Sequence, residues 1–494
     1  MLLAFLLAVV EGTVVNAITG AHIAGVKVEI RQAGCSAATA VSDASGGFRV
    51  EGLAEGEYSA SFLASDFYYP RGAVDFRVGP GAALRLRVEL TPLARLSGRV
   101  VDGERRPAAG VAVELIRIGN AAMNVTRTGQ EGEFAFETVI PGTYWLAARP
   151  ARREFGKLHR VKLERPESSD AARLDWAPTF YPAAGDRGAA SRIVAPAGAD
   201  LGGFEVRLRA VPVYEVRGVA FDETGNRAAD VLIELSEPEG QGYTEYEAVS
   251  DAGGAFAIGG VREGEWRIFA RPREADSKLR GFGEVMVAGG DVDRLEVRLA
   301  APFTMSGHVN LAGAAVVLTA PDHSRRRAFA VHEPDGSFRF EEVYQGRYRI
   351  ETVGTPRAAY LASILVGERE VLGQEVDLGP GSPPIRVIYG SNPGRVRGTV
   401  ENGEDCTAAV VPREEALITE QYVRTAPCRA GGRFEAGGLR PGEYSVFAFE
   451  NLNRESLYDA ACRAWLAARA VKVEVREGEA AEVSLRLSPG CEVE

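Results

Sequence analysis

Hydrophobic and polar residues alternate along much of the chain, and the alternation belongs to a unit that recurs five times. In each copy a Phe is followed eight residues later by Gly and ten residues later by Tyr or Trp. The copies are Phe48/Gly56/Tyr58, Phe134/Gly142/Tyr144, Phe256/Gly264/Trp266, Phe338/Gly346/Tyr348 and Phe434/Gly442/Tyr444. A spacing that is kept while the residues around it change indicates an array of similar structural modules.

The apolar residues around each copy lie two positions apart, which is the period of a strand with one buried face. Phe48 and Val50 lie in one such run, and Tyr58 begins the next. In two copies Pro141 or Pro441 directly precedes the Gly, a pair typical of a type II turn. The unit therefore predicts strand, turn and strand, with the aromatic residue near the start of the second strand.

Each copy also opens with a short β-rich run that begins at a Gly, and most copies close with another alternating run. The opening glycines are Gly12, Gly98, Gly218, Gly307 and Gly398. Six or seven short strands in roughly 80–100 residues are typical of a small β-sandwich. We predict an all-β chain of five tandem antiparallel β-sandwich modules, transthyretin-like or Ig-like, in an elongated array.

Links near Pro92, Pro212, Pro302 and Pro393 set the expected boundaries. The predicted modules are 9–92, 93–211 with an insertion, 212–301, 302–392 and 393–490. Residues 1–8 are apolar and resemble the hydrophobic part of a secretory signal peptide that has been cut short. The alternative is that Val9 and Val10 already belong to the first strand. No apolar run is long enough to predict a membrane-spanning helix.

The net charge argues against one class of function, and the cysteines bear on the compartment in which the protein folds. The formal net charge of -11 argues against non-specific binding to nucleic acid, which needs a basic face. Of the five cysteines, Cys406, Cys428, Cys462 and Cys491 all fall in the last module, while Cys35 is alone in the first. Two disulfides in the last module would fit an oxidising compartment, with Cys35 left over. The alternative is that all five are reduced and buried.

Catalytic motifs are missing from the sequence. It contains no G-x-S-x-G elbow, no phosphate-binding loop and no H-E-x-x-H motif. His308, His323 and His332 lie close together in the fourth module, but three arginines lie between them, so we interpret them as surface residues. Asp43, Asp251 and Asp335 recur at one turn, where an Asx turn is favoured over a calcium site. We therefore predict no enzyme activity, no metal and no cofactor.

The segments Ser42–Tyr58 and Ser250–Trp266 carry the pattern Ser-Asp-x-x-Gly-x-Phe followed by Gly-Glu-Tyr/Trp, and so resemble the carboxypeptidase regulatory-like domain. Copies two and five depart from it, with Thr128-Gly129 and Cys428-Arg429 at the Ser-Asp positions. The resemblance implies a transthyretin-like sandwich, grouped with carbohydrate-binding-like folds. The chain also resembles multi-module bacterial cell-envelope proteins, which implies a secreted or otherwise extracytoplasmic location in the periplasm or at the cell surface.

Two aromatic clusters are the candidate ligand-binding residues: Phe67, Tyr68 and Tyr69 in the first module, and Trp176, Phe180 and Tyr181 in the second. Aromatic rings with polar neighbours are suited to binding a glycan. The preferred interpretation is structural, with these rings closing a sandwich or packing one module on the next. We predict a non-catalytic binding or scaffolding protein whose partner is an envelope protein or a polysaccharide. The alternative is a carbohydrate-binding array that recognises a glycan through the two clusters.

Overall fold

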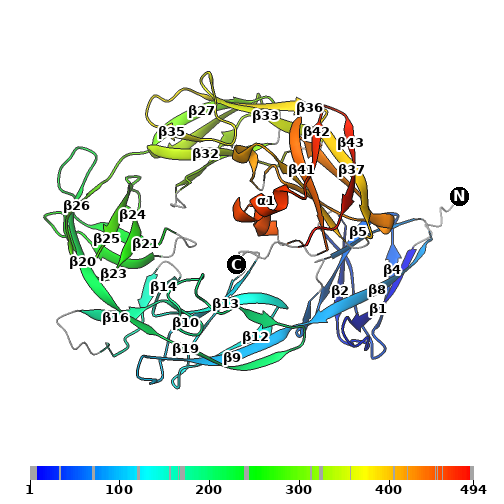
Figure 1. Ribbon diagram of the computed structural model, residues 1–494, viewed down its shortest axis with the longest axis horizontal. Coiled ribbons are helices and arrows are strands. Elements are labelled where there is room, and N and C mark those ends of the chain that lie inside the picture. The colour runs from blue at the N-terminus through cyan, green and yellow to red at the C-terminus, as the bar shows by residue number, and fades with distance from the viewer. Residues whose placement is uncertain are drawn as a thin grey trace. The chain divides into compact units, whose positions relative to one another are not determined.

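The computed structural model describes residues 8–489, apart from 33–34, 69–72, 80, 119–122, 155–156, 165, 167–172, 239–243, 312–313, 322–325, 356–357, 404–405, 420, 451, 453 and 459. The chain forms two compact units. Unit 1 comprises Met1–Pro150, Val161–Glu164 and Trp176–Ala210, and unit 2 comprises Ala151–Arg160, Arg165–Asp175 and Val211–Glu494. Figure 1 labels their elements.

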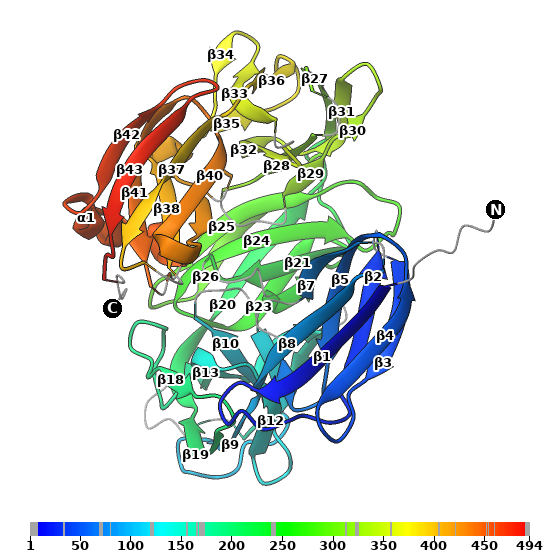
Figure 2. The ribbon, with the colours of Figure 1, turned by 90° about the vertical axis from the view of Figure 1, so that its right-hand side faces the viewer.

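Unit 1 begins with a sandwich of two sheets ordered β4-β1-β8-β6 and β3-β2-β5-β7. Its strands are β1 (Ala8–Asn16), β2 (Lys27–Gln32), β3 (Cys35–Val41), β4 (Gly47–Leu53), β5 (Gly56–Leu63), β6 (Phe67–Tyr68), β7 (Ala73–Val78) and β8 (Ala83–Pro92). Figure 2 shows β1 between β4 and β8. Ala8, Val9 and Val10 belong to β1, so the alternative for Val9 and Val10 is confirmed; residues 1–7 of the predicted signal segment lie outside the described residues.

The second sandwich of unit 1 pairs sheet β12-β9-β19 with sheet β11-β10-β13-β17, to which β18 adds through β13. The strands are β9 (Ala94–Val101), β10 (Ala112–Arg117), β11 (Met123–Arg127), β12 (Glu133–Val139), β13 (Gly142–Arg149), β17 (Thr179–Phe180), β18 (Ile193–Ala195) and β19 (Asp200–Arg207). A single residue, Leu93, separates β8 from β9, so the linker is very short.

Unit 2 contains the third sandwich, with sheets β16-β20-β23, to which β26 adds through β20, and β22-β21-β24-β25. Its strands are β16 (Leu174–Ala177), β20 (Arg209–Phe221), β21 (Val231–Ser236), β22 (Thr244–Val249), β23 (Ala255–Arg262), β24 (Gly264–Pro272), β25 (Gly281–Val287) and β26 (Val292–Arg298). Pro212, expected in a link, lies inside β20. Part of the predicted insertion, the hairpin of β14 (Ala151–Glu154) and β15 (Lys157–Arg160), lies against β22.

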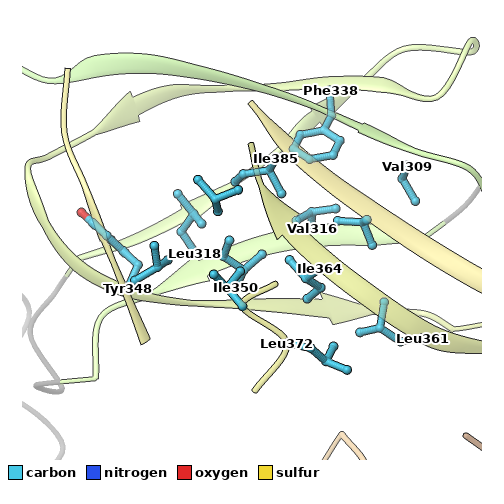
Figure 3. Packing of buried hydrophobic residues seen from close by; sticks show 14 of the residues in the cluster. Val309, Val316, Leu318, Phe338, Tyr348, Ile350, Leu361, Ile364, Leu372 and Ile385 are labelled. Atoms are coloured by element: carbon cyan, nitrogen blue, oxygen red, sulfur yellow. The ribbon is translucent and has the colours of Figure 1, made fainter. Parts of the chain in front are cut away.

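The fourth sandwich has sheets β30-β31-β27-β36-β33-β34 and β29-β28-β32-β35. The strands are β27 (Phe303–Val309), β28 (Ala315–Thr319), β29 (Arg327–Phe329), β30 (Val331–His332), β31 (Ser337–Val343), β32 (Gly346–Val353), β33 (Ala359–Val366), β34 (Arg369–Glu370), β35 (Glu375–Leu378) and β36 (Ile385–Ser391). Figure 3 shows its core, in which Phe338, Tyr348 and Ile385 pack with aliphatic side chains between the sheets.

The fifth sandwich has sheets β40-β37-β43 and β39-β38-β41-β42. The strands are β37 (Gly394–Glu401), β38 (Thr407–Pro412), β39 (Arg424–Pro427), β40 (Arg433–Leu439), β41 (Gly442–Phe449), β42 (Val471–Val475) and β43 (Ala480–Arg486). Helix α1 (Ala460–Ala467) and the short 3-10 helices η1 (Glu415–Leu417), η2 (Ala430–Gly432) and η3 (Arg454–Leu457) lie in its connections. The all-β fold class with tandem sandwiches is therefore confirmed, while the exact module boundaries remain predictions.

One strand pair in each sandwich departs from the antiparallel arrangement predicted for the modules. The opening and closing strands run parallel: β1 with β8, β9 with β19, β20 with β26, β27 with β36 and β37 with β43. Alternation of apolar residues identifies a strand but not its direction, because parallel and antiparallel strands share the period of two. A parallel pair needs a long crossover, and here the rest of each module provides it.

The structure explains why Gly and Phe recur together. The opening Gly of each copy is the cross-strand partner of the repeat Phe, from Gly12 opposite Phe48 to Gly398 opposite Phe434. In the first four copies the ring covers the Gly so closely that a Cβ there would lie within 2.8 Å of a ring carbon, as at Gly12, where the distance is 2.3 Å. A side chain at this position in these four copies would therefore displace the buried ring and destabilise the sandwich.

The recurring Tyr or Trp is fixed by one hydrogen bond that is repeated in all five sandwiches. Each ring donates to the backbone carbonyl four residues upstream: Tyr58 to Ala54, Tyr144 to Ile140, Trp266 to Arg262, Tyr348 to Tyr344 and Tyr444 to Arg440. The ring is buried in every case. A buried aromatic residue that ties its polar tip to a nearby carbonyl is the tyrosine corner known from other sandwiches.

Candidate functional site

The first predicted cluster lies at the end of the first sandwich. Phe67 and Tyr68 form β6 and pair with Pro92 and Thr91 of β8. Both side chains are partly buried, and Phe67 packs against the core of the sandwich. Tyr69 lies outside the described residues. The two described rings are therefore partly accessible, but they are also part of the closure of the sandwich.

The second predicted cluster is largely interior. Trp176 is 6% exposed, lies in the core of the second sandwich, and donates from Nε1 to the carbonyl of Glu164 at 2.8 Å. Phe180 is 7% exposed and packs on Ile116 and Ala147. Tyr181 packs against the same core as Trp176 and meets the ring of Phe204 edge to face, with centroids 5.3 Å apart.

Burial of Trp176 and Phe180 supports the structural interpretation of the second cluster, because a ring without exposed faces has no surface to offer a sugar. Both clusters consist of three aromatic residues, but Phe67 and Tyr68 are partly exposed whereas Trp176 and Phe180 are buried. Glycan binding itself stays a prediction, and it now concerns chiefly Phe67, Tyr68 and Tyr181.

The recurring Asp residues act as predicted, in Asx turns. Asp43 Oδ1 accepts from the backbone N–H of Ser45 at 2.8 Å and of Gly47 at 3.0 Å. Asp251 and Asp335 accept in the same way from the residues that follow them. These bonds lower the pKa of the Asp43 carboxyl, chiefly through the hydroxyl and N–H of Ser45. Asx turns are confirmed at all three positions.

The second copy has Gly129 in place of Asp, and the carboxylate of another residue, Glu133, accepts a hydrogen bond in this turn. The carboxylate of Glu133 accepts from the backbone N–H of Glu131 at 2.9 Å, and a Cβ on Gly129 would collide with that carboxylate. Thr128 also replaces Ser42 without loss, since its hydroxyl accepts from Val111 N–H and donates to the Ala108 carbonyl. The apparent departures in sequence thus keep the same hydrogen-bonding pattern.

Among the described residues, no group of three or more His, Cys, Asp or Glu side chains gathers in a way that could hold a metal ion. His332 accepts a hydrogen bond from Val316 N–H at 3.3 Å and lies against Phe338, while His323 is outside the described part of the chain. Nor does any described helix have the length and apolar character needed to span a membrane.

The structure shows disulfide bonding in the last sandwich. Cys406 and Cys428 form a disulfide, and Cys462 is also disulfide-bonded, while Cys491 lies outside the described residues. Cys35 is free and exposed. The alternative that all five cysteines are reduced and buried is therefore wrong.

Neighbouring modules within unit 2 are joined by contacts that no local sequence pattern predicts. Arg160 of the β14–β15 hairpin donates to the carbonyl of Glu245 at 3.2 Å and stacks over Tyr246, whose pKa burial raises to about 12. Leu417 and Tyr422, from the fifth predicted module, are buried in the core of the fourth sandwich. These residues lie in segments unique to one copy, so the repeat did not reveal them.

Comparison with known protein families gives a match in the first two sandwiches. The family model of the carboxypeptidase regulatory-like domain matches residues 9–91 and 95–171. No curated protein matches the chain. Solved structures with some likeness are the Bacillus anthracis TIE protein (11% identity, TM-score 0.18, 60% of this chain and 51% of that one), a streptococcal ancillary pilin (11%, 0.22, 60% and 99%) and the Bacillus cereus major pilin subunit BcpA (12%, 0.17, 59% and 99%).

This chain thus spans about half the length of the TIE protein, and structural likenesses at such low TM-scores say nothing about function. The family match rests on the first two sandwiches, where the Gly–Phe pair, the Asx turn or its Glu133 substitute, and the aromatic corner are all present. Residues 9–91 and 95–171 therefore match the carboxypeptidase regulatory-like domain.

Proposed function

We propose that the chain is a non-catalytic, extracytoplasmic scaffold whose sandwich modules present or space a partner in the cell envelope. The observation that carries the proposal is that the recurring residues of every copy are used for its own fold. Phe, Gly and Tyr or Trp build the inner face and the corner, and the recurring Asp residues or Glu133 hold a turn. The recurring residues therefore stabilise each module, and a series of stable modules is what a spacer requires.

Two further features support this proposal. Linkers are short, with only Asn392 and Pro393 between β36 and β37, and short linkers with Pro restrict motion between modules. The Cys406–Cys428 disulfide is typical of proteins that fold in an oxidising compartment. We therefore infer export, and an envelope protein or polysaccharide as the partner.

Cell fractionation of the source organism, with thiols blocked at lysis, tests the proposal. We expect the chain outside the cytoplasm, with Cys406 and Cys428 protected from alkylation and Cys35 modified. In the same cells, a photo-crosslinking amino acid at exposed positions of the sandwiches should capture a defined envelope component. A cytoplasmic chain with reduced Cys406 and Cys428 would contradict it.

Glycan binding is the second candidate, favoured by the partial exposure of Phe67 and Tyr68. The test is a polysaccharide pull-down and glycan array with the full chain beside a Phe67→Ala/Tyr68→Ala variant. Phe329→Ala, which removes an exposed ring from the fourth sandwich, is the matched control. Binding lost only in the double variant would support the candidate, and equal binding by all three would contradict it.

A further inference from the structure

A basic pocket lies in unit 2, where the third sandwich meets the fourth. Its volume is about 330 Å³, near the lower end of the range for ligand pockets. Four arginines line it: Arg267, Arg280, Arg298 and Arg326. Of the described residues in the lining, only Glu284 is acidic. This gathering of guanidinium groups is notable in a chain whose formal net charge is -11.

The first three arginines come from the third sandwich. Arg267 on β24 forms an ion pair with Glu284, its cross-strand partner on β25. Arg298 at the end of β26 pairs with Glu296 at 2.7 Å, outside the pocket lining. Arg280 differs, because its Nη1 donates to the backbone carbonyls of Ser277 at 2.8 Å and Leu279 at 2.7 Å. Carbonyls orient a guanidinium group but leave its full positive charge in place.

The fourth arginine comes from the next sandwich. The guanidinium of Arg326 lies over the ring of Phe282, 5.1 Å from its centroid, and donates to the carbonyl of Gln345. Phe282 in turn meets Tyr344 of the fourth sandwich at 5.4 Å, and the Tyr344 hydroxyl donates to the carbonyl of Lys278 at 2.7 Å. The aromatic pair thus fixes Arg326 on the side of the pocket that belongs to the fourth sandwich.

We propose that this pocket binds an oligoanion, a ligand that carries two or more carboxylate, sulfate or phosphate groups. Arginine donors in a fixed fork bind such oxyanions in pairs of parallel hydrogen bonds. Arg280 has no carboxylate partner among the described residues, and it faces the same cavity as Arg326 of the neighbouring module. One ligand would therefore engage both modules and stiffen their junction, which goes beyond a general scaffolding role.

Calorimetric titration of the full chain at low ionic strength tests the site with three probes. Tripolyphosphate represents a free small anion, hexagalacturonate a carboxylated polymer, and a heparin hexasaccharide a sulfated one. We expect at least one probe to bind, with affinity that falls as salt is added, because exposed charges are screened. The Arg280→Gln/Arg326→Gln variant should weaken that binding by about tenfold or more, since each hydrogen bond to a charged group contributes on this scale.

Two further variants keep the test decisive. Arg298→Gln alters an exposed residue at the rim, so it should fold normally and still weaken binding severalfold if the pocket is the site. Arg339→Gln removes an equally exposed, ion-paired arginine from β31 outside the pocket and should leave affinity unchanged. Absence of binding by all three probes would overturn the proposal. So would equal weakening by Arg339→Gln, and neither result would affect the location of the chain in the cell.

Discussion

The first and fifth sandwiches share an inner face but differ in what covers their outer face. In both, the second sheet turns its Tyr corner inward, with Tyr58 and Tyr444 buried. The residue five positions after the Tyr is Leu63 on β5 in the first sandwich and Phe449 on β41 in the fifth. Each pairs with the first residue of the neighbouring strand, β2 or β38. Leu63 is 56% exposed and Phe449 only 2%.

The difference comes from one added segment. In the fifth sandwich the connection between β41 and β42 carries η3 and α1, and Leu457, Cys462 and Leu466 from this connection cover Phe449. In the first sandwich the corresponding strands are β5 and β7, and the described part of their connection forms the short strand β6. Leu63 stays exposed there. The repeated residues therefore determine the inner face of the sheet, whereas inserted segments determine whether its outer face is covered.

The largest expected effect is the loss of the covered ring. Phe449→Ala should destabilise the fifth sandwich by about 3–5 kcal/mol, since it removes a fully buried aromatic side chain and leaves a cavity. The matched change Leu63→Ala should alter the first sandwich by about 0.5 kcal/mol or less, because the side chain is mostly in water. Amide hydrogen exchange read separately on peptides of each sandwich measures both. Similar costs at the two positions would show that α1 does not protect Phe449.

The second effect concerns the disulfide, which the first sandwich lacks. Cys406→Ala/Cys428→Ala should cost the fifth sandwich about 2–4 kcal/mol, because the cross-link closes a loop and limits the unfolded chain. Cys35→Ala is the control and should be close to neutral, as Cys35 is exposed and free. Differential scanning calorimetry of the full chain would detect a transition that moves in the first variant only. An unchanged thermogram for the double variant would contradict the prediction.

What could be predicted from the sequence follows the same division. Phe48, Gly56 and Tyr58 have counterparts at fixed spacing in every copy, so their pattern predicted strand, turn and strand in each sandwich. The parallel pairing of β1 with β8 could not be predicted, since alternation carries no direction. The burial of Trp176 and Phe180 agrees with the structural interpretation that was preferred from the sequence. The gathering of Arg280 with Arg326 could not be predicted, because it depends on segments that meet only in the folded chain.

The third effect concerns the opening glycine of each module, which is required for different steric reasons in the first and fifth sandwiches. Gly12→Ala should cost about 1–3 kcal/mol, since the new Cβ would lie 2.3 Å from the ring of Phe48. Gly398→Ala should cost a similar amount, but there the nearest atom is the backbone oxygen of Val483, at 2.0 Å. Shortening the ring should therefore relieve the ring part of the first clash, leaving the Leu86 carbonyl oxygen at 2.8 Å, and none of the second. Double-mutant cycles with Phe48→Leu and Phe434→Leu should show coupling of about 0.5–3 kcal/mol only in the first sandwich.

The smallest effect is a pH dependence confined to the Asx turns. The pKa of Asp43 is lowered below its ordinary value of 3.8 by hydrogen bonds from Ser45 and Gly47. A carboxyl whose pKa is lowered in the folded state stabilises that state above its unfolded pKa, and the contribution is lost as the pH falls through the folded value. The corresponding residue of the fifth sandwich is Arg429, which has no carboxyl group.

Acidification from pH 5 to pH 3 should therefore loosen the turn at Asp43 while the turn at Arg429 keeps its protection. Hydrogen exchange of the Ser45 and Gly47 amides, corrected for the intrinsic pH dependence, measures the first, and the Gly432 amide, which donates to the Arg429 carbonyl, reports the second. Asp43→Asn keeps an acceptor oxygen without a titrating group and should remove the pH dependence. If Asp43→Asn loosened with acid as much as the native turn, the dependence would lie elsewhere in the first sandwich, and the carboxylate of Asp43 would not be its cause.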